Sequence, residues 1–543
     1  MTKIAIRVVL LSMPLIVLLI ALPFQPSISV YSGDTDFDAV RAMKLLEEIT
    51  SKYKYRVVGS ESSKRIVRWI ADYFRGLGLE TYIQSFYAPG FGRKRVLAHN
   101  VYAIKRGYES RYIILIAHHD IVPYTIEGAN DNGAGLAILL ELARVFANRS
   151  TRLSIIFLAS DAEETGLHGA KYFADNFPQI SRVVAAISID MCAWKGSEEV
   201  SLMAFMGCRN PFVVCDGGVL YVIKSLERLG YRVRVARANI VSRVGLVMGG
   251  TDSMPFVDYG ISSVGIVDYD YPYWHKLEDT IDKISVEKLE IVGTLVERTV
   301  LTIDSMGDIP RIGAHFIFLD GYVVTTVFTY LMYISTYSPM ILFLYEARDI
   351  LFQRRRLRSS LSSFLVLLLI MAVILLLSIS LMISFGKAFE ILVAAVGTAI
   401  VLNIVYGRSF RIEDWQSFKL VAATFMALAY SVGFVNPIVA LIVLTPSFYL
   451  VCLAKPIDRR LTRFLLSIAY PCIAFVTELL FIAVGISIWG PKILSYNIAW
   501  ALRMLMAYLP NILALVVFYS LTLAAVVSAS VHVLRYRMRG DHH

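Results

Sequence analysis

The stretch that decides the fold is Tyr-Ile-Ile-Leu-Ile-Ala-His-His-Asp, residues 112–120. Six apolar residues, 112–117, lead directly into three polar residues that can bind metals or move protons. A short, continuous apolar run is typical of a strand that is buried on both faces of a parallel sheet. Ligand sites of such sheets lie at the carboxyl ends of the strands. The stretch therefore predicts a functional site around residues 118–120.

The flanking sequence alternates between short apolar runs and helical patterns. Further strands are expected at 96–104, 153–159, 183–189, 200–205 and 261–267. Helices are expected at 38–49, 62–77, 131–147, 167–176, 218–229 and 285–303. This alternation predicts an α/β fold, with a mostly parallel sheet and helices on both of its faces.

Five segments place His, Asp or Glu at or near expected strand ends. These residues are His118 and Asp120, Asp131 in the Gly-rich stretch 128–135, Glu163 and Glu164, Asp190, and His275. Imidazole and carboxylate groups together suit zinc or a similar divalent ion. Two ions held close together need one bridging carboxylate and further ligands on each ion.

This order of motifs resembles the M28 family of zinc exopeptidases, over roughly residues 40–300. The family pattern is His-x-Asp, then Gly-Ala-x-Asp-Asn, Glu-Glu, Asp and finally His, and each element is present here. The resemblance implies two zinc ions bridged by Asp131. It implies that His118 and Asp190 complete one site and that Glu164 and His275 complete the other. Glu163 would be the general base, and Asp120 would hold the His118 ring.

Three other residues are weaker candidates for a supporting or substrate-contacting role. The His-x-Asp register favours His118 over His119, which is expected to fill the wall of the site. Asp252 lies where the family has Ser-Asp-His, but here Ser253 replaces the histidine. Asp252 then either supports the metal ligands or caps a loop. Tyr273 either donates to the substrate oxyanion or serves in packing.

Charge and apolar residues lie in different parts of the 543-residue chain. The net charge is +10 and 57% of the residues are hydrophobic. Residues 1–308 hold 34 basic and 34 acidic side chains, so the whole positive excess lies in the apolar remainder. This distribution argues against a nucleic-acid partner. It favours a lipid bilayer as the surroundings of the C-terminal part.

A membrane-spanning helix needs about 20 mostly apolar residues. One candidate, 4–22, is an anchor or a cleaved signal. Seven more are expected at about 322–345, 361–385, 389–406, 418–435, 437–454, 464–488 and 509–533. One alternating set of connecting loops holds 15 Lys and Arg residues and the other holds three. Because Lys and Arg mark the cytoplasmic side, residues from about 30 to 310 are expected outside the cytoplasm, at the cell surface or in an organelle lumen.

The predicted organisation is therefore an N-terminal anchor or signal (1–30), an M28-like domain (31–308) and a membrane domain of about seven helices (309–543). It resembles that of endoplasmic-reticulum metallopeptidases and vacuolar membrane proteases. Glu478, expected within a membrane helix, is either functional or a structural hydrogen-bonding group. Cys208 and Cys215 could form a disulfide.

The leading hypothesis is a membrane-bound zinc aminopeptidase that acts on peptides outside the cytoplasm. One alternative is an acyltransferase similar to glutaminyl cyclase, with one zinc ion. Another is a non-catalytic receptor or scaffold on the same fold. The stretch with Asn132 directly after Asp131 resembles that of the dinuclear peptidases rather than that of the cyclases. The presence of every implied ligand argues against a scaffold. No oligomeric state is predicted.

Overall fold

The computed structural model describes residues 3–92, 94–203, 215–235, 250–268, 271–319, 322–346, 348 and 352–353. The chain divides into two compact units. One is Gln25–Phe316, called the α/β unit below, and the other consists of Met1–Phe24 with Ile317–His543. Every candidate metal ligand lies in the α/β unit.

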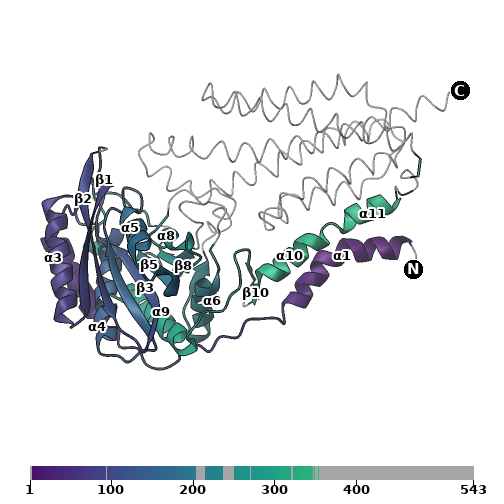
Figure 1. Cartoon of the computed structure of the whole chain (residues 1–543), viewed down its shortest axis with the longest axis horizontal. Coiled ribbons are helices and arrows are strands. Elements are labelled where there is room, and N and C mark those ends of the chain that lie inside the picture. The colour runs from purple at the N-terminus through teal and green to yellow at the C-terminus, as the bar shows by residue number, and fades with distance from the viewer. Residues whose placement is uncertain are drawn as a thin grey trace, which may run out of the picture. The chain divides into compact units, whose positions relative to one another are not determined.

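The α/β unit contains an eight-stranded sheet with the order β1-β2-β4-β3-β5-β8-β6-β7 (Figure 1). The strands are β1 (Glu80–Pro89), β2 (Arg95–Lys105), β3 (Glu109–His118), β4 (Leu153–Ser160), β5 (Val183–Asp190), β6 (Val200–Met203), β7 (Val233–Val235) and β8 (Ser262–Val267). The central strands β4, β3, β5 and β8 are parallel. The pairs β1–β2, β2–β4 and β6–β8 are antiparallel. The predicted α/β class is confirmed, but the sheet is mixed, with its parallel part at the centre.

Helices cover both faces of this sheet (Figure 1). They are α2 (Ala39–Lys52), α3 (Glu61–Gly76), α4 (Gly135–Ala147), α5 (His168–Asn176), α6 (Gly218–Ser225), α8 (Met254–Val257) and α9 (Val286–Met306). On one face, Ile114 and Ile116 of β3 share a buried cluster with Phe173 of α5 and Phe256 of α8. Alternate strand residues point to the opposite face, where α4 packs on β3, β4 and β5.

The sequence pattern missed β1 and β7 and misplaced the start of α4. In β1 the first six residues are not buried, so the strand lacks the apolar run used to find the others. β7 is three residues long and has Arg234 at its centre. The helix expected from 131 begins at Gly135, because residues Ala129–Ala134 form a separate turn in which Asp131 and Asn132 have non-helical backbone angles.

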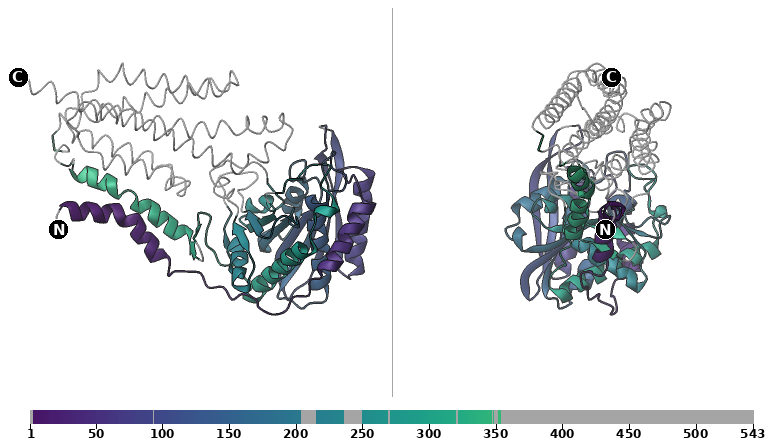
Figure 2. Two further views of the ribbon diagram at one scale, coloured as in Figure 1. Left: turned by 180° about the vertical axis from the view of Figure 1, so that it is seen from behind. Right: turned by 90° about the vertical axis from the view of Figure 1, so that its right-hand side faces the viewer.

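The other unit contains α1 (Lys3–Ala21), which packs along α10 (Thr326–Ser335) and α11 (Ser338–Glu346) (Figure 2). Its short strands are β9 (Ile317–Leu319) and β10 (Tyr322–Val324). In the described part of the chain, no helix has the length and hydropathy that crossing a membrane requires.

The candidate span at 322–345 is therefore not one helix in the structure. It comprises β10 and the two helices α10 and α11, which are separated at residues 336–337. Pro339 lies in the first turn of α11. Proline has no N–H to donate to the preceding turn and favours the start of a helix over its interior. The six later candidate spans, Glu478 and Cys208 lie outside the described residues.

Candidate metal centre

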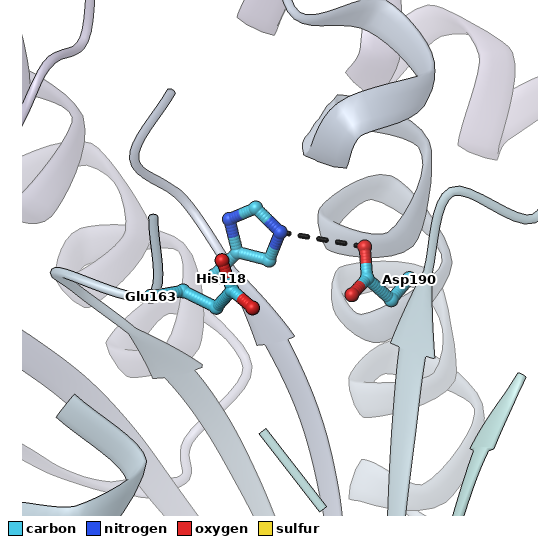
Figure 3. A group of neighbouring side chains, drawn as sticks. All are labelled: His118, Glu163 and Asp190. Atoms are coloured by element: carbon cyan, nitrogen blue, oxygen red, sulfur yellow. Dashed lines mark hydrogen bonds and ion pairs between the residues drawn. The ribbon is translucent and has the colours of Figure 1, made fainter. Parts of the chain in front are cut away.

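Three neighbouring parallel strands deliver candidate ligands to one edge of the sheet. β3 ends at His118, β5 ends at Asp190, and the turn after β4 carries Glu163 and Glu164. Because β3 lies between β4 and β5, groups from both neighbours flank the His118 ring (Figure 3). The ligand atoms of His118, Glu163 and Asp190 lie within 4.8 Å of one another.

Asp131 lies between two pairs of potential ligands. Its Oδ1 is 3.4 Å from Nε2 of His118, and its Oδ2 is 3.3 Å from Nε2 of His275. His118 Nε2 is also 3.4 Å from Oδ1 of Asp190, and His275 Nε2 is 2.8 Å from Oε2 of Glu164. One carboxylate thus faces two imidazole–carboxylate pairs. Two divalent ions that share a bridging ligand require this arrangement.

Asp120 contacts the backbone of Glu163 and Glu164 and the ring of His118. Its Oδ1 accepts a hydrogen bond from the Glu163 N–H (3.1 Å), and its Oδ2 accepts one from the Glu164 N–H (3.3 Å). Nδ1 of His118 lies 3.2 Å from the Asp120 carbonyl oxygen. A neutral His118 that donates from Nδ1 keeps the lone pair of Nε2 directed at the site. Oδ1 of the Asp120 carboxylate also lies 3.6 Å from His118 Nδ1. Asp120 therefore faces the His118 ring with both its backbone and its side chain, and the same carboxylate holds the Glu163–Glu164 turn.

The turn that carries Asp131 is held by Asp279, whose contact with this turn the sequence does not predict. Asp279 accepts hydrogen bonds from the N–H groups of Asn130 (2.8 Å) and Asp131 (3.1 Å). The Tyr271 hydroxyl donates to the same carboxylate at 2.6 Å. Asp279 follows His275 by four residues, and this spacing alone does not predict contact with a turn nearly 150 residues away.

Asn132 couples the Asp131 turn to the end of β5. Its side-chain amide donates to the Ile189 carbonyl at 2.8 Å. Its oxygen accepts hydrogen bonds from the N–H groups of Gly135 (3.1 Å) and Met191 (3.3 Å). These contacts fix Asp131 relative to Asp190, which lies between Ile189 and Met191.

Three residues at the site have left-handed backbone angles that residues other than glycine seldom adopt. They are Ala162 (φ 56°), Met191 (φ 45°) and His275 (φ 55°). The first precedes Glu163 and the second follows Asp190. Each such residue costs on the order of 1–2 kcal/mol, so the surrounding contacts have to stabilise these turns.

The three weaker candidates do not supply atoms to the two ligand groups. Nε2 of His119 lies 3.0 Å from the His99 carbonyl oxygen, and the ring is buried. Asp252 is buried and accepts a hydrogen bond from the Ser160 hydroxyl. The Tyr273 ring is half-buried and lies 5.2 Å from the Lys283 ammonium.

Burial and mutual repulsion perturb the acidic groups of the metal-free protein. Burial, with the charges of Glu164 and Asp190, raises the pKa of Glu163 well above its ordinary value, although His118 opposes this shift. Burial also raises the pKa of Glu164 and of Asp252 to about 7. Asp131 differs, because His118 and His275 lower its pKa despite burial.

The two histidines are perturbed in the opposite sense to buried histidines in apolar surroundings. Burial lowers the pKa of His275, but Glu164 and Asp131 raise it to about 10. Burial likewise opposes protonation of His118, but Glu163 and Asp190 raise its pKa well above the ordinary value. Without metal, protons thus occupy the positions between the carboxylates.

The donor set fits a divalent metal ion. Glu164 Oε1 is buried and accepts no hydrogen bond from the described residues. A buried oxygen of this kind is costly unless another group, such as a cation, satisfies it. Mixed imidazole and carboxylate ligands are typical of zinc sites.

Comparison with known proteins agrees with this geometry. Residues 100–300, which contain all the candidate ligands, match the model of Peptidase family M28. This segment of the chain is therefore similar to the zinc metallopeptidases of family M28. Aminopeptidase YwaD of Bacillus subtilis (strain 168) is 30% identical over 219 residues, which cover 37% of this chain and 44% of that protein.

Two further similarities extend over related parts of the chain. "Putative endoplasmic reticulum metallopeptidase 1" of Schizosaccharomyces pombe is 25% identical over 266 residues, covering 44% of this chain and 30% of that protein. The structure of a zinc aminopeptidase from Bacillus subtilis aligns with a TM-score of 0.42 at 19% identity, covering 49% of this chain and 95% of that one. The chain spans less than half the length of Aminopeptidase YwaD and of the Schizosaccharomyces pombe metallopeptidase.

We expect zinc binding to the metal-free protein to release protons and to strengthen as the pH rises. At pH 7 the raised pKa values keep His118 and His275 protonated, whereas zinc binds neutral imidazole. Titration calorimetry at pH 7 in buffers of different ionisation enthalpy should show release of at least two protons, because Glu164, with a pKa of about 7, is also partly protonated. A binding enthalpy that is independent of the buffer would contradict the protonated state of both rings.

Proposed function

We propose that the M28 domain of this chain is a zinc-dependent aminopeptidase that removes N-terminal residues from peptides. The observation that carries the proposal is the Asp131 carboxylate, which faces His118 with one oxygen and His275 with the other. Asp131 would bridge two zinc ions. His118 and Asp190 would hold one ion, and Glu164 and His275 the other. The similarity to Aminopeptidase YwaD supports the choice of an aminopeptidase.

Zinc would supply Lewis acidity, lowering the pKa of water and polarising the peptide carbonyl. Glu163 is the carboxylate of the site that is left over when the bridge and the paired ligands have been assigned. Its carboxylate lies beside His118 and Asp190, within reach of the same small volume. It is suited to accept a proton from the attacking water and to deliver it to the leaving amine.

The surroundings of Glu163 suit this proton transfer. Its pKa is raised by burial and by neighbouring carboxylates, so it is a stronger base than an exposed glutamate. Bound cations would offset part of this shift. The hydrogen bond from the Glu163 N–H to Asp120 fixes the backbone from which the side chain extends.

Glu163→Gln should keep the metal and lose hydrolysis. The amide has nearly the same shape but cannot accept the proton, and general-base catalysis contributes about 10²- to 10⁴-fold. We therefore expect kcat on a peptide with a free N-terminus to fall by about that factor, with unchanged zinc content. Glu278→Gln is a matched control, because Glu278 is exposed and lies near His275 in the chain.

The same assay tests the class of reaction. Peptides with a free N-terminus should be cleaved, and the same peptides with a blocked N-terminus should not. Adding a chelator should abolish cleavage of the free peptides, and adding zinc back should restore it. Undiminished activity of Glu163→Gln would overturn the base assignment. Cyclisation of N-terminal glutamine without peptide hydrolysis would favour the glutaminyl cyclase alternative.

We also propose that the chain is attached to a membrane and that the M28 domain faces away from the cytoplasm. The support comes from the sequence. Its apolar segments are long enough to span a membrane, and one alternating set of the loops between them holds 15 Lys and Arg residues whereas the other set holds three. The single Asn-x-Ser/Thr sequon of the chain, at Asn148, lies in the M28 domain. Asn148 is exposed at the C-terminal end of α4.

Translation of the full chain with endoplasmic-reticulum microsomes tests this orientation. We expect a glycan on Asn148, detected as a mobility shift that an endoglycosidase removes and that Asn148→Gln abolishes. A second sequon introduced near Arg408 should stay unmodified. This residue lies between the candidate spans 389–406 and 418–435, in one of the basic loops that are expected in the cytoplasm. Modification of the introduced sequon with none at Asn148 would contradict the proposed orientation.

A further inference from the structure

Arg56 is a buried cation beside the metal centre that the proposed reaction does not use. It lies between α2 and α3, and its side chain is 0% exposed. Its Nη1 donates to the Glu127 carbonyl, and its Nη2 donates to the Gly128 carbonyl at 2.7 Å. A charged group fully removed from water is costly unless it is satisfied, so its two carbonyl partners have to contribute to holding it there.

The turn that carries Asp131 is closed tightly around this guanidinium. Gly128 has φ 56°, and a Cβ placed on it would lie 3.0 Å from Nη2 of Arg56 and 2.6 Å from the Asp131 carbonyl oxygen. The Gly128 carbonyl also accepts a hydrogen bond from the Gly133 N–H at 2.9 Å. Arg56 and Gly133 thus share one acceptor, and Asp131 lies within the loop that this contact closes.

Arg56 is close enough to the acidic groups of the site to interact with them electrostatically. Burial lowers its pKa to about 10, opposed by Asp279 first and then by Asp131, Asp120 and Glu164. The side chain therefore stays charged at neutral pH. Among the described residues, no carboxylate forms an ion pair with it within 4.0 Å, and its hydrogen bonds go to backbone carbonyls.

We propose that Arg56 is a positioning residue of the metal centre, which fixes the 127–133 turn and thereby holds Asp131 between the two metal positions. The inference rests on the proposed function in one respect, namely that Asp131 bridges two zinc ions. The fork of the guanidinium is essential, because it reaches two carbonyls at once. The single ammonium of lysine has no such planar fork, so lysine would keep the charge without reproducing the contact.

Positioning and simple charge effects predict opposite changes in metal affinity. If Arg56 acted by charge alone, its removal would strengthen zinc binding, because it would remove a cation near the carboxylates. If it positions Asp131, its removal weakens zinc binding. Residues that hold metal ligands in place typically change metal affinity by about 10- to 100-fold when they are substituted.

The test compares Arg56→Lys and Arg56→Met with wild type in the full chain. Arg149→Met is the matched control, since Arg149 pairs with Glu297 (2.8 Å) and Asp36 (3.2 Å), neither of which is a candidate metal ligand. Zinc affinity is measured by chelator competition. The absorption spectrum of the Co²⁺-loaded protein reports ligand geometry, and thermal unfolding reports stability.

We expect both Arg56 variants to bind zinc about 10- to 100-fold more weakly and to change the Co²⁺ spectrum. Arg149→Met should lower only the unfolding temperature. Unchanged affinity and spectrum in Arg56→Lys would overturn the inference, as would tighter binding in Arg56→Met. If Arg56→Met does not fold, Arg56→Lys alone decides. If wild type itself binds no zinc, the proposed function fails, an outcome separate from any difference between the variants.

Discussion

The structure depends on a set of carboxylates that are buried next to one another. Asp131, Glu164 and Asp190 converge on two histidines, and Glu163 joins them at the same edge of the sheet. Such a cluster is unfavourable in a folded protein unless protons or cations compensate its charge. In the metal-free protein, the raised pKa values of Glu163, Glu164 and the two histidines compensate this charge with protons, and bound zinc would compensate it in the active protein. The buried guanidinium of Arg56 contributes a permanent positive charge close by.

Several of the ligands are held by groups that do not themselves belong to the ligand set. Asp120 holds the Glu163–Glu164 turn, and Asp279 holds the Asp131 turn through two backbone N–H groups. Asn132 ties that turn to the end of β5. These contacts come from elements far apart in the sequence, so the central sheet has to form before the site can. The Asn132 contact also holds Met191, one of the left-handed residues at the site, through its backbone N–H.

The sequence identified the residues that meet at the site better than it identified the groups that hold them, and their role as metal ligands stays a prediction. The apolar run before His118 identified a central strand, and similar runs located β4, β5 and β8. The motif order that resembles the M28 family pointed to Asp131, Glu164 and His275, and the structure brings these three residues together. Asp279 and Arg56 could not be found in this way, because they act through backbone groups and carry no motif of their own. The edge strand β1 was missed because it is largely exposed, and the break between α10 and α11 was missed because hydropathy outweighed Pro339.

The central claim is that Asp131 is shared by two zinc ions. An anomalous difference map, recorded at the zinc edge from crystals of the zinc-loaded protein, tests it most directly. We predict two peaks roughly 3.5–4 Å apart on either side of the Asp131 carboxylate. One should lie beside His118 and Asp190, and the other beside Glu164 and His275. A single peak in fully loaded crystals, or two peaks of which only one touches Asp131, would contradict the account.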